Sequence, residues 1–168
     1  MEDKIEGNVY KFGDDINTDY IIPGKYLMNV IDPNELATHV MEGVNPNFYE
    51  EIEEGDIIAA GENFGCGSSR EEAPTVIRDA GISVVLAKSF ARIFYRNAIN
   101  IGLPLMECST DNLNGGDRIK VNLDAGVISF KNRNDTFEAK PLPKAMQKIL
   151  NDGGLVAHFN KNDGFGLK

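Results

Sequence analysis

Residues 56–81 read DIIAAGENFGCGSSREEAPTVIRDAG. Residues 56–60, of which the last four are apolar, are typical of a buried strand, and residues 73–80 carry a helical pattern that ends at a glycine. The turn between them contains Gly61, Gly65 and Gly67. Glycines allow the backbone to approach a bound group closely, and free N–H groups at the start of a helix favour an anion. The stretch therefore predicts a strand, a glycine-rich turn and a helix that together bind a carboxylate or a phosphate.

The start of this helix is marked by two signals. Residues 68–72, SSREE, contain two serine-to-glutamate spacings that match a capping box. Pro74 lacks the N–H group that a helix needs beyond its first turn. We therefore expect the helix to begin no earlier than Glu71, so that the two serines and Arg70 lie in the entry turn with side chains free to face a ligand.

The remaining sequence predicts alternating strands and helices, followed by a hairpin. Expected strands are residues 8–12, 82–87 and 103–107, expected helices are 33–41 (capped by Asp32), 90–101 (capped by Ser89) and 142–150, and the expected hairpin pairs 117–123 with 127–130. The nearly continuous apolar run 82–87 is typical of a strand covered on both faces in a parallel sheet. This order predicts an α/β fold with a mixed sheet and flanking helices.

Composition limits the class of protein. The chain has 168 residues, of which 42% are hydrophobic, and we interpret residues 1–168 as one domain with a frayed tail at 160–168. A net charge of -9 argues against nucleic acid as a partner. No apolar run approaches the ~20 residues of a membrane span, and the charged start does not resemble a signal peptide. We therefore expect a cytoplasmic protein.

Several catalytic chemistries are disfavoured by the residues present. Cys66, Cys108, His39 and His158 lack the spacing of a metal site, and two cysteines cannot hold an iron-sulfur cluster alone. Nothing in the sequence places a histidine beside Cys66 as a base. A serine-hydrolase elbow fails because Arg70 stands where its last glycine belongs, and no P-loop lysine follows the glycines. A plain anion-binding module remains open.

Two other groups of polar residues have open interpretations. Residues 14–24 either cap a turn through Asn, Thr and Asp side chains or present Asp19 to a ligand. Arg92 and Arg96 lie four residues apart on one face of a predicted helix. We interpret this pair as solvated or partner-facing in preference to catalytic.

Five sequence segments carry a resemblance to a known family. They read NTDYIIP at 17–23, YL at 26–27, NFGCGSSREEAP at 63–74, AKSFARIFYRN at 87–97 and NIGLP at 100–104. In this order they resemble the small subunits of 3-isopropylmalate dehydratase, which form the separate swivelling domain of the aconitase superfamily. The resemblance covers roughly residues 8–160.

This resemblance implies a three-layer β/β/α swivelling domain that is one half of a hydro-lyase. The family enzyme isomerises 2-isopropylmalate and 3-isopropylmalate by dehydration and rehydration in leucine biosynthesis. Activity would require a large subunit, which would carry a [4Fe-4S] cluster. By analogy, Ser68 would act as the catalytic base, while Arg70 would clamp a carboxylate of the small di-acid substrate with help from Ser69. Asp19 would orient groups at the reacting centre, and Thr18 would be a further substrate-binding residue.

The resemblance also places substrate choice in the segment around Leu27 and Met28. The resemblance implies that relatives acting on a third carboxylate, such as homoaconitase, supply an arginine here, and residues 28–30 contain none. An uncharged substrate side chain is therefore expected. Glu72 stands where the family most often has histidine. A dehydratase of methylmalate, dimethylmalate or homocitrate remains an alternative, as do a non-catalytic anion-binding module and a purely structural subunit.

Overall fold

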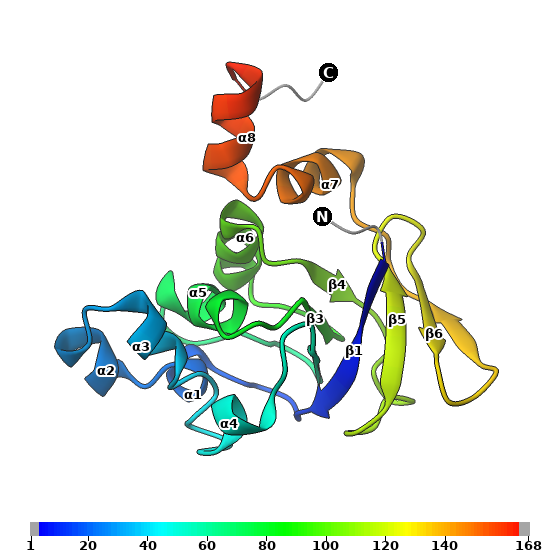
Figure 1. Cartoon of the computed structure of the whole chain (residues 1–168), viewed down its shortest axis with the longest axis horizontal. Coiled ribbons are helices and arrows are strands. Elements are labelled where there is room, and N and C mark those ends of the chain that lie inside the picture. The colour runs from blue at the N-terminus through cyan, green and yellow to red at the C-terminus, as the bar shows by residue number, and fades with distance from the viewer. Residues whose placement is uncertain (1–3, 165–168) are drawn as a thin grey trace.

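A computed structural model describes residues 4–164, which form a mixed sheet in the order β4-β3-β2-β1-β5-β6-β7 (Figure 1). The strands are β1 (Lys4–Lys11), β2 (Ile57–Ala60), β3 (Val84–Ala87), β4 (Leu105–Glu107), β5 (Arg118–Asn122), β6 (Val127–Phe130) and β7 (Thr136–Glu138). Strands β1 to β4 run parallel, whereas β5, β6 and β7 pair antiparallel. The first strand joins the two parts, because residues 9–11 pair with β2 and residues 4–8 pair with β5.

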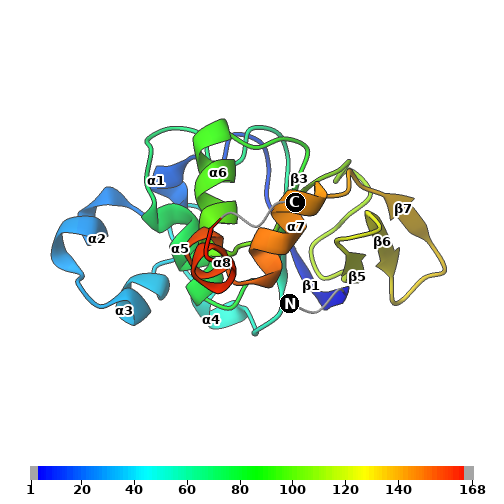
Figure 2. The ribbon, with the colours of Figure 1, turned by 90° about the horizontal axis from the view of Figure 1, so that it is seen from above.

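The two faces of the parallel strands pack against different layers. In β2, Ile58 and Ala60 belong to the core beneath the helices, whereas Ile57 and Ala59 belong to a second core shared with β5 and β6. Figure 2 shows β1 and β3 between the helices on one side and β5, β6 and β7 on the other. The predicted β/β/α layering and mixed sheet are confirmed, as is the burial of the 82–87 strand on both faces.

The helices differ in how they contact this sheet. They are α1 (Thr18–Ile21), α2 (Gly24–Asn29), α3 (Pro33–Ala37), α4 (Phe48–Glu51), α5 (Glu72–Asp79), α6 (Arg92–Ile101), α7 (Lys144–Asn151) and α8 (Leu155–Asn162). Helices α5 and α6 follow β2 and β3, while α7 and α8 pack on α6. Helices α2 and α3 form a projection at one side of the molecule (Figure 1). No helix in residues 4–164 is long and apolar enough to cross a membrane.

The predicted helix 33–41 is too long. Asp32 caps it as expected, accepting a hydrogen bond from the Asn34 N–H at 2.9 Å, but α3 ends at Ala37. The chain then turns because Met41 has a φ of 57° and donates its N–H to the Ile21 carbonyl at 2.7 Å. His39 therefore lies in this turn and not on a helix.

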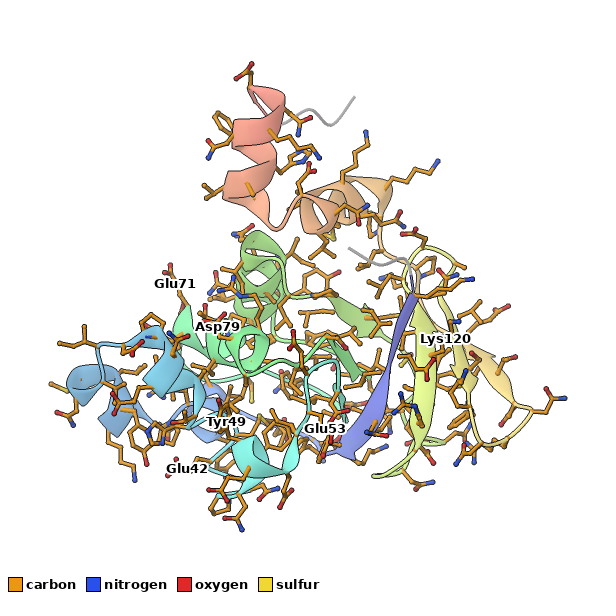
Figure 3. All side chains as sticks on the ribbon, in the orientation of Figure 1. Glu42, Tyr49, Glu53, Glu71, Asp79 and Lys120 are labelled. Carbon is orange, nitrogen blue, oxygen red and sulfur yellow. The ribbon has the colours of Figure 1, made fainter. Side chains whose placement is uncertain are left out.

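The predicted Ser89 cap of the 90–101 helix is wrong. The Ser89 hydroxyl accepts a hydrogen bond from the Asn63 N–H at 2.8 Å, and α6 begins at Arg92 with Ala91 as its cap. No side-chain bond caps α5, and its N-cap Glu71 stands out into solvent (Figure 3). The expectation that this helix begins no earlier than Glu71 is confirmed. The two serines before it are consequently not used as caps.

The predicted frayed tail is helical at its start. Helix α8 includes residues 160–162, and the rest of the tail from 165 onwards lies outside the described residues. Asp152 holds α8 through the His158 ring at 2.6 Å and the Lys161 ammonium at 2.5 Å. These are contacts between residues six and nine positions apart, which a search for apolar periodicity does not detect.

Candidate functional site

The glycine-rich turn lies beyond the carboxyl ends of the parallel strands. The Gly65 N–H donates to the Ile16 carbonyl at 2.7 Å, and the Thr18 N–H donates to the Cys66 carbonyl at 2.8 Å. On its other side, the Ala91 N–H donates to the Phe64 carbonyl at 2.9 Å. The turn thus connects the loops that follow β1 and β3. Ligands of open α/β sheets bind at this edge of the sheet.

Two glycines in the turn are required by its conformation. Gly65 has a φ of 81°, and a Cβ atom built there would lie 2.2 Å from Cγ of Phe94. Gly67 has a φ of 96°, which is also in the left-handed region. The absence of a side chain at Gly65 allows the first turn of α6 to pack directly against the glycine-rich turn.

Ser68 and Ser69 are exposed in the turn between Gly67 and α5. The Ser68 carbonyl accepts a hydrogen bond from the buried Thr18 hydroxyl at 2.9 Å. Neither serine hydroxyl is bonded to another group within the part of the chain that the structure describes. Thr18 therefore fixes the backbone of the turn, and both serine hydroxyls are available to a ligand.

Arg70 is held at the site by two acceptors. Its Nη1 donates to Asp19 Oδ1 and to the Ile22 carbonyl, each at 2.9 Å. The same Asp19 oxygen accepts the Gly24 N–H at 3.1 Å. The bonds from Arg70 and Gly24 lower the pKa of the Asp19 carboxyl. Nε and Nη2 of Arg70 have no protein acceptor among residues 4–164, so they can form a fork to a carboxylate.

These side chains line a cavity of about 530 Å³. The lining includes three arginines and no acidic residue, although the whole chain carries a net charge of -9. The lining residues are Thr18, Gly65, Gly67, Ser68, Ser69, Arg70, Ala91, Arg92, Ile93, Phe94, Arg96 and Asn97. A concave surface with this lining favours an anion.

Helix α6 supplies cavity residues that sequence reasoning missed. Arg92, Arg96 and Asn97 line the cavity together with Ile93, which is 56% exposed. The predicted order of parallel strands did contain a signal for this placement of α6. Because β2 and β3 are parallel neighbours, the loops that follow them had to meet at one edge of the sheet.

The remaining polar groups do not form a thiol catalyst or a metal site. Burial and the nearby Asp15 raise the pKa of the half-buried Cys66 thiol, and burial raises the pKa of Cys108 to about 11. Both shifts disfavour the thiolate. Within residues 4–164, no group of three His, Cys, Asp or Glu side chains is placed to hold a metal ion.

Leu27 and Met28 lie on the projecting helix α2 and do not line the cavity. Leu27 packs on the core beneath the helices, whereas Met28 is 89% exposed. Glu72 is exposed at the start of α5 and also lies outside the cavity lining. The roles predicted for Leu27 and Met28 in substrate binding stay predictions.

Comparison with known proteins agrees with the motifs. Residues 15–110 match the family model of the aconitase C-terminal domain. The chain is 56% identical over 158 residues to 3-isopropylmalate dehydratase small subunit 1 of Methanopyrus kandleri, covering 93% of this chain and 92% of the relative. The chain belongs to the family of 3-isopropylmalate dehydratase small subunits. The resemblance inferred from the sequence motifs is thereby confirmed.

Two further members of this family show the same agreement, and a more distant protein shares only the fold. The small subunit of Methanosarcina mazei is 48% identical and covers 94% of this chain and 97% of its own length. The crystal structure of 3-isopropylmalate dehydratase from Methanocaldococcus jannaschii has a TM-score of 0.91 and 49% identity, with 95% of each chain covered. Aconitase X of Thermococcus kodakaraensis, at 16% identity and a TM-score of 0.50, shares the fold alone; the match covers 76% of this chain and 89% of that one.

Proposed function

We propose that this chain is the small subunit of a hydro-lyase that interconverts 2-isopropylmalate and 3-isopropylmalate by dehydration and rehydration. Its relatives carry this enzyme's name at about half identity and over nearly their full length. The observation that carries the proposal is an exposed, unbonded Ser68 hydroxyl beside Arg70 in a cavity lined by three arginines. A small di-acid matches this positive lining in charge.

Each residue of the turn has a distinct role in the proposal. Arg70 holds a substrate carboxylate through Nε and Nη2, while Asp19 and the Ile22 carbonyl fix its Nη1. Ser68 takes the proton from the carbon next to the leaving hydroxyl. A serine hydroxyl is a poor base unless its anion is stabilised, and Arg70 and the N–H groups of the entry turn supply that stabilisation. Ser69 helps to hold the carboxylate.

The aconitase family implies a [4Fe-4S] cluster in the assembled enzyme. The residues of this chain do not fit such a cluster, because Cys66 and Cys108 are its only two thiols and no suitable group of ligands forms in residues 4–164. We therefore place the cluster on the large subunit. The name of the relatives, small subunit, implies such a partner.

Exchange of Ser68 for alanine tests the proposed base. Ser68→Ala should abolish dehydration in the complex reconstituted with the large subunit while subunit association is unchanged. Ser109→Ala is the matched control, because Ser109 is exposed and lies outside the cavity lining. Turnover by Ser68→Ala equal to that of the control would remove Ser68 from the mechanism. Saturable binding of isopropylmalate to this chain, without turnover in any complex, would favour the alternative of an anion-binding module.

Substrate choice is tested at Met28. An uncharged residue at this position favours an isopropyl or methyl substituent on the substrate, whereas an arginine suits a third carboxylate. Met28→Arg should therefore lower kcat/KM for isopropylmalate and raise it for homocitrate, with Met28→Gln as the uncharged control. A wild-type preference for homocitrate would refute this assignment. Methylmalate and dimethylmalate should be tested as substrates in the same assay. The cytoplasmic location expected from the sequence stays a prediction.

A further inference from the structure

A second cavity, of about 540 Å³, lies along α6 and shares Arg92 and Arg96 with the cavity at the glycine-rich turn. It is lined by residues of α6, α7, the end of β4 and the segment 140–143, and it is open to solvent on one side. Apolar side chains form most of its lining: Phe90, Tyr95, Ile99, Pro141, Leu142, Pro143, Met146 and Ile149. None of the proposed catalytic residues reaches this cavity, so the established family activity gives it no role.

The charged groups at the second cavity leave a positive surplus. Lys140 Nζ lies 3.6 Å from Glu107 Oε2. Glu107 is the only acidic residue in the lining, and this ion pair balances its charge. Arg92 and Arg96 also line the cavity. Neither guanidinium group is paired with an acceptor in the part of the chain that the structure describes. The cavity thus combines a mostly apolar lining with two arginines that have no partner among residues 4–164.

We propose that this second cavity binds a small monocarboxylic acid with an apolar chain. The carboxylate would contact Arg92 or Arg96, and the chain would lie against Leu142, Met146 and Ile149. A second carboxylate at the far end of the chain would lose its water against Leu142, Met146 and Ile149 without gaining a partner there.

The two cavities share Arg92 and Arg96. A carboxylate bound in the second cavity competes for guanidinium groups that also contribute positive charge to the first. Occupancy of the second cavity should therefore weaken anion binding at the glycine-rich turn. This coupling needs no change of fold, because the side chains of one helix face serve both sites.

Binding of hexanoate to the full-length chain tests the proposal. Titration followed by NMR should give saturable shifts at residues 140–149, with hexanamide, the neutral analogue, about tenfold weaker. Butanoate should also bind about tenfold more weakly, because it lacks two methylene groups. Neither measurement depends on catalysis, so the outcome is independent of the proposed dehydratase function.

Variants of Ile149 locate the site. Ile149→Glu places a carboxylate in the cavity, whereas Ile149→Gln introduces a side chain of similar shape to Glu without its charge. Ile149→Glu should weaken hexanoate binding at least about tenfold more than Ile149→Gln. Val156→Glu adds the same charge on α8, where Val156 is 73% exposed and outside the cavity, and should leave binding unchanged. Equal binding by Ile149→Glu and Ile149→Gln, equal affinity for hexanoate and hexanamide, or shifts confined to residues 65–70 would overturn the proposal.

Discussion

Replacement of Arg70 by lysine separates geometry from charge at the proposed clamp. Nη1 of Arg70 already serves Asp19 and the Ile22 carbonyl, and only a planar fork leaves Nε and Nη2 for a substrate carboxylate. A lysine ammonium presents all its donors at one point, so it must give up the protein acceptors or the substrate. Loss of one hydrogen bond to a charged group costs about 1.5–3 kcal/mol, which corresponds to a roughly 10- to 150-fold fall in kcat/KM.

The stability of the chain should change far less. The Asp19 side chain is 66% exposed, and an exposed ion pair contributes about 0.2–1 kcal/mol. The free energy of unfolding of Arg70→Lys should therefore lie within about 1 kcal/mol of wild type by urea denaturation. A large loss of activity with a small loss of stability would locate the effect at the ligand.

Initial rates of isopropylmalate dehydration by the reconstituted complex supply the assay. Arg78→Lys is the matched control, because Arg78 lies on α5, pairs with Asp79 and does not line the cavity. The control should retain wild-type kcat/KM. If Arg70→Lys retained it as well, the fork would not be needed and Arg70 would act only as a positive charge or as a structural tie to Asp19.

Two further predictions concern stability. Gly65→Ala should lower the free energy of unfolding by about 2–5 kcal/mol, because the new Cβ meets the Phe94 ring at 2.2 Å and the residue has a φ of 81°; a loss below about 1 kcal/mol in urea denaturation would contradict the packing described. Bonds from Lys161 and His158 lower the pKa of Asp152 from 3.8 to about 2, so this carboxylate stabilises the fold above pH 3.8, and the contribution is lost as the pH falls towards 2. Asp152→Asn should flatten that part of the stability curve, and urea midpoints of both proteins on either side of the window would show whether it does.

The strands and layers could be predicted because they depend on local patterns. Residues 57–60 and 84–87 are buried on both faces, and their unbroken apolar runs indicated this directly. Helix boundaries were harder to predict where contacts between residues far apart in the sequence determine them. Met41 ends the α3 region by bonding to Ile21, twenty positions earlier, and Asp152 orders α8 through His158 and Lys161. Neither contact leaves a periodic signal.

The sequence predicted the part of the site that lies in the glycine-rich turn, but not the part that α6 contributes. Glycine spacing and Pro74 placed Ser68 and Arg70 in an exposed turn, as the structure shows. Arg92 and Arg96 were expected to face solvent or a partner, because nothing in their own segment links them to residue 68. That link comes from the parallel pairing of β2 with β3, which brings α6 to the same edge of the sheet.

Helix α2, which carries Met28, depends on contacts outside its own segment. It buries none of its residues fully. The Tyr26 hydroxyl donates to Glu42 Oε1 at 2.5 Å. The Tyr26 ring stacks on the His39 ring, with 3.7 Å between the ring centroids. Partial burial raises the pKa of the Glu42 carboxyl, but the bonds from Tyr26 and His39 outweigh this effect, so the pKa is lowered overall. Figure 3 shows Glu42 on the side of the molecule from which α2 and α3 project.

The other attachment of α2 runs through the proposed carboxylate clamp. Asp19 Oδ1 accepts both the Gly24 N–H, at the start of α2, and Nη1 of Arg70. A change in the orientation of Arg70 therefore shifts one of the bonds that position Met28. Because Met28 is 89% exposed and lies outside the cavity lining, it can influence substrate choice only if α2 is held in a defined place when the large subunit or the substrate covers it. On the proposed role of Met28, we therefore expect specificity to depend on Asp19 and Glu42 as well as on the residue at position 28.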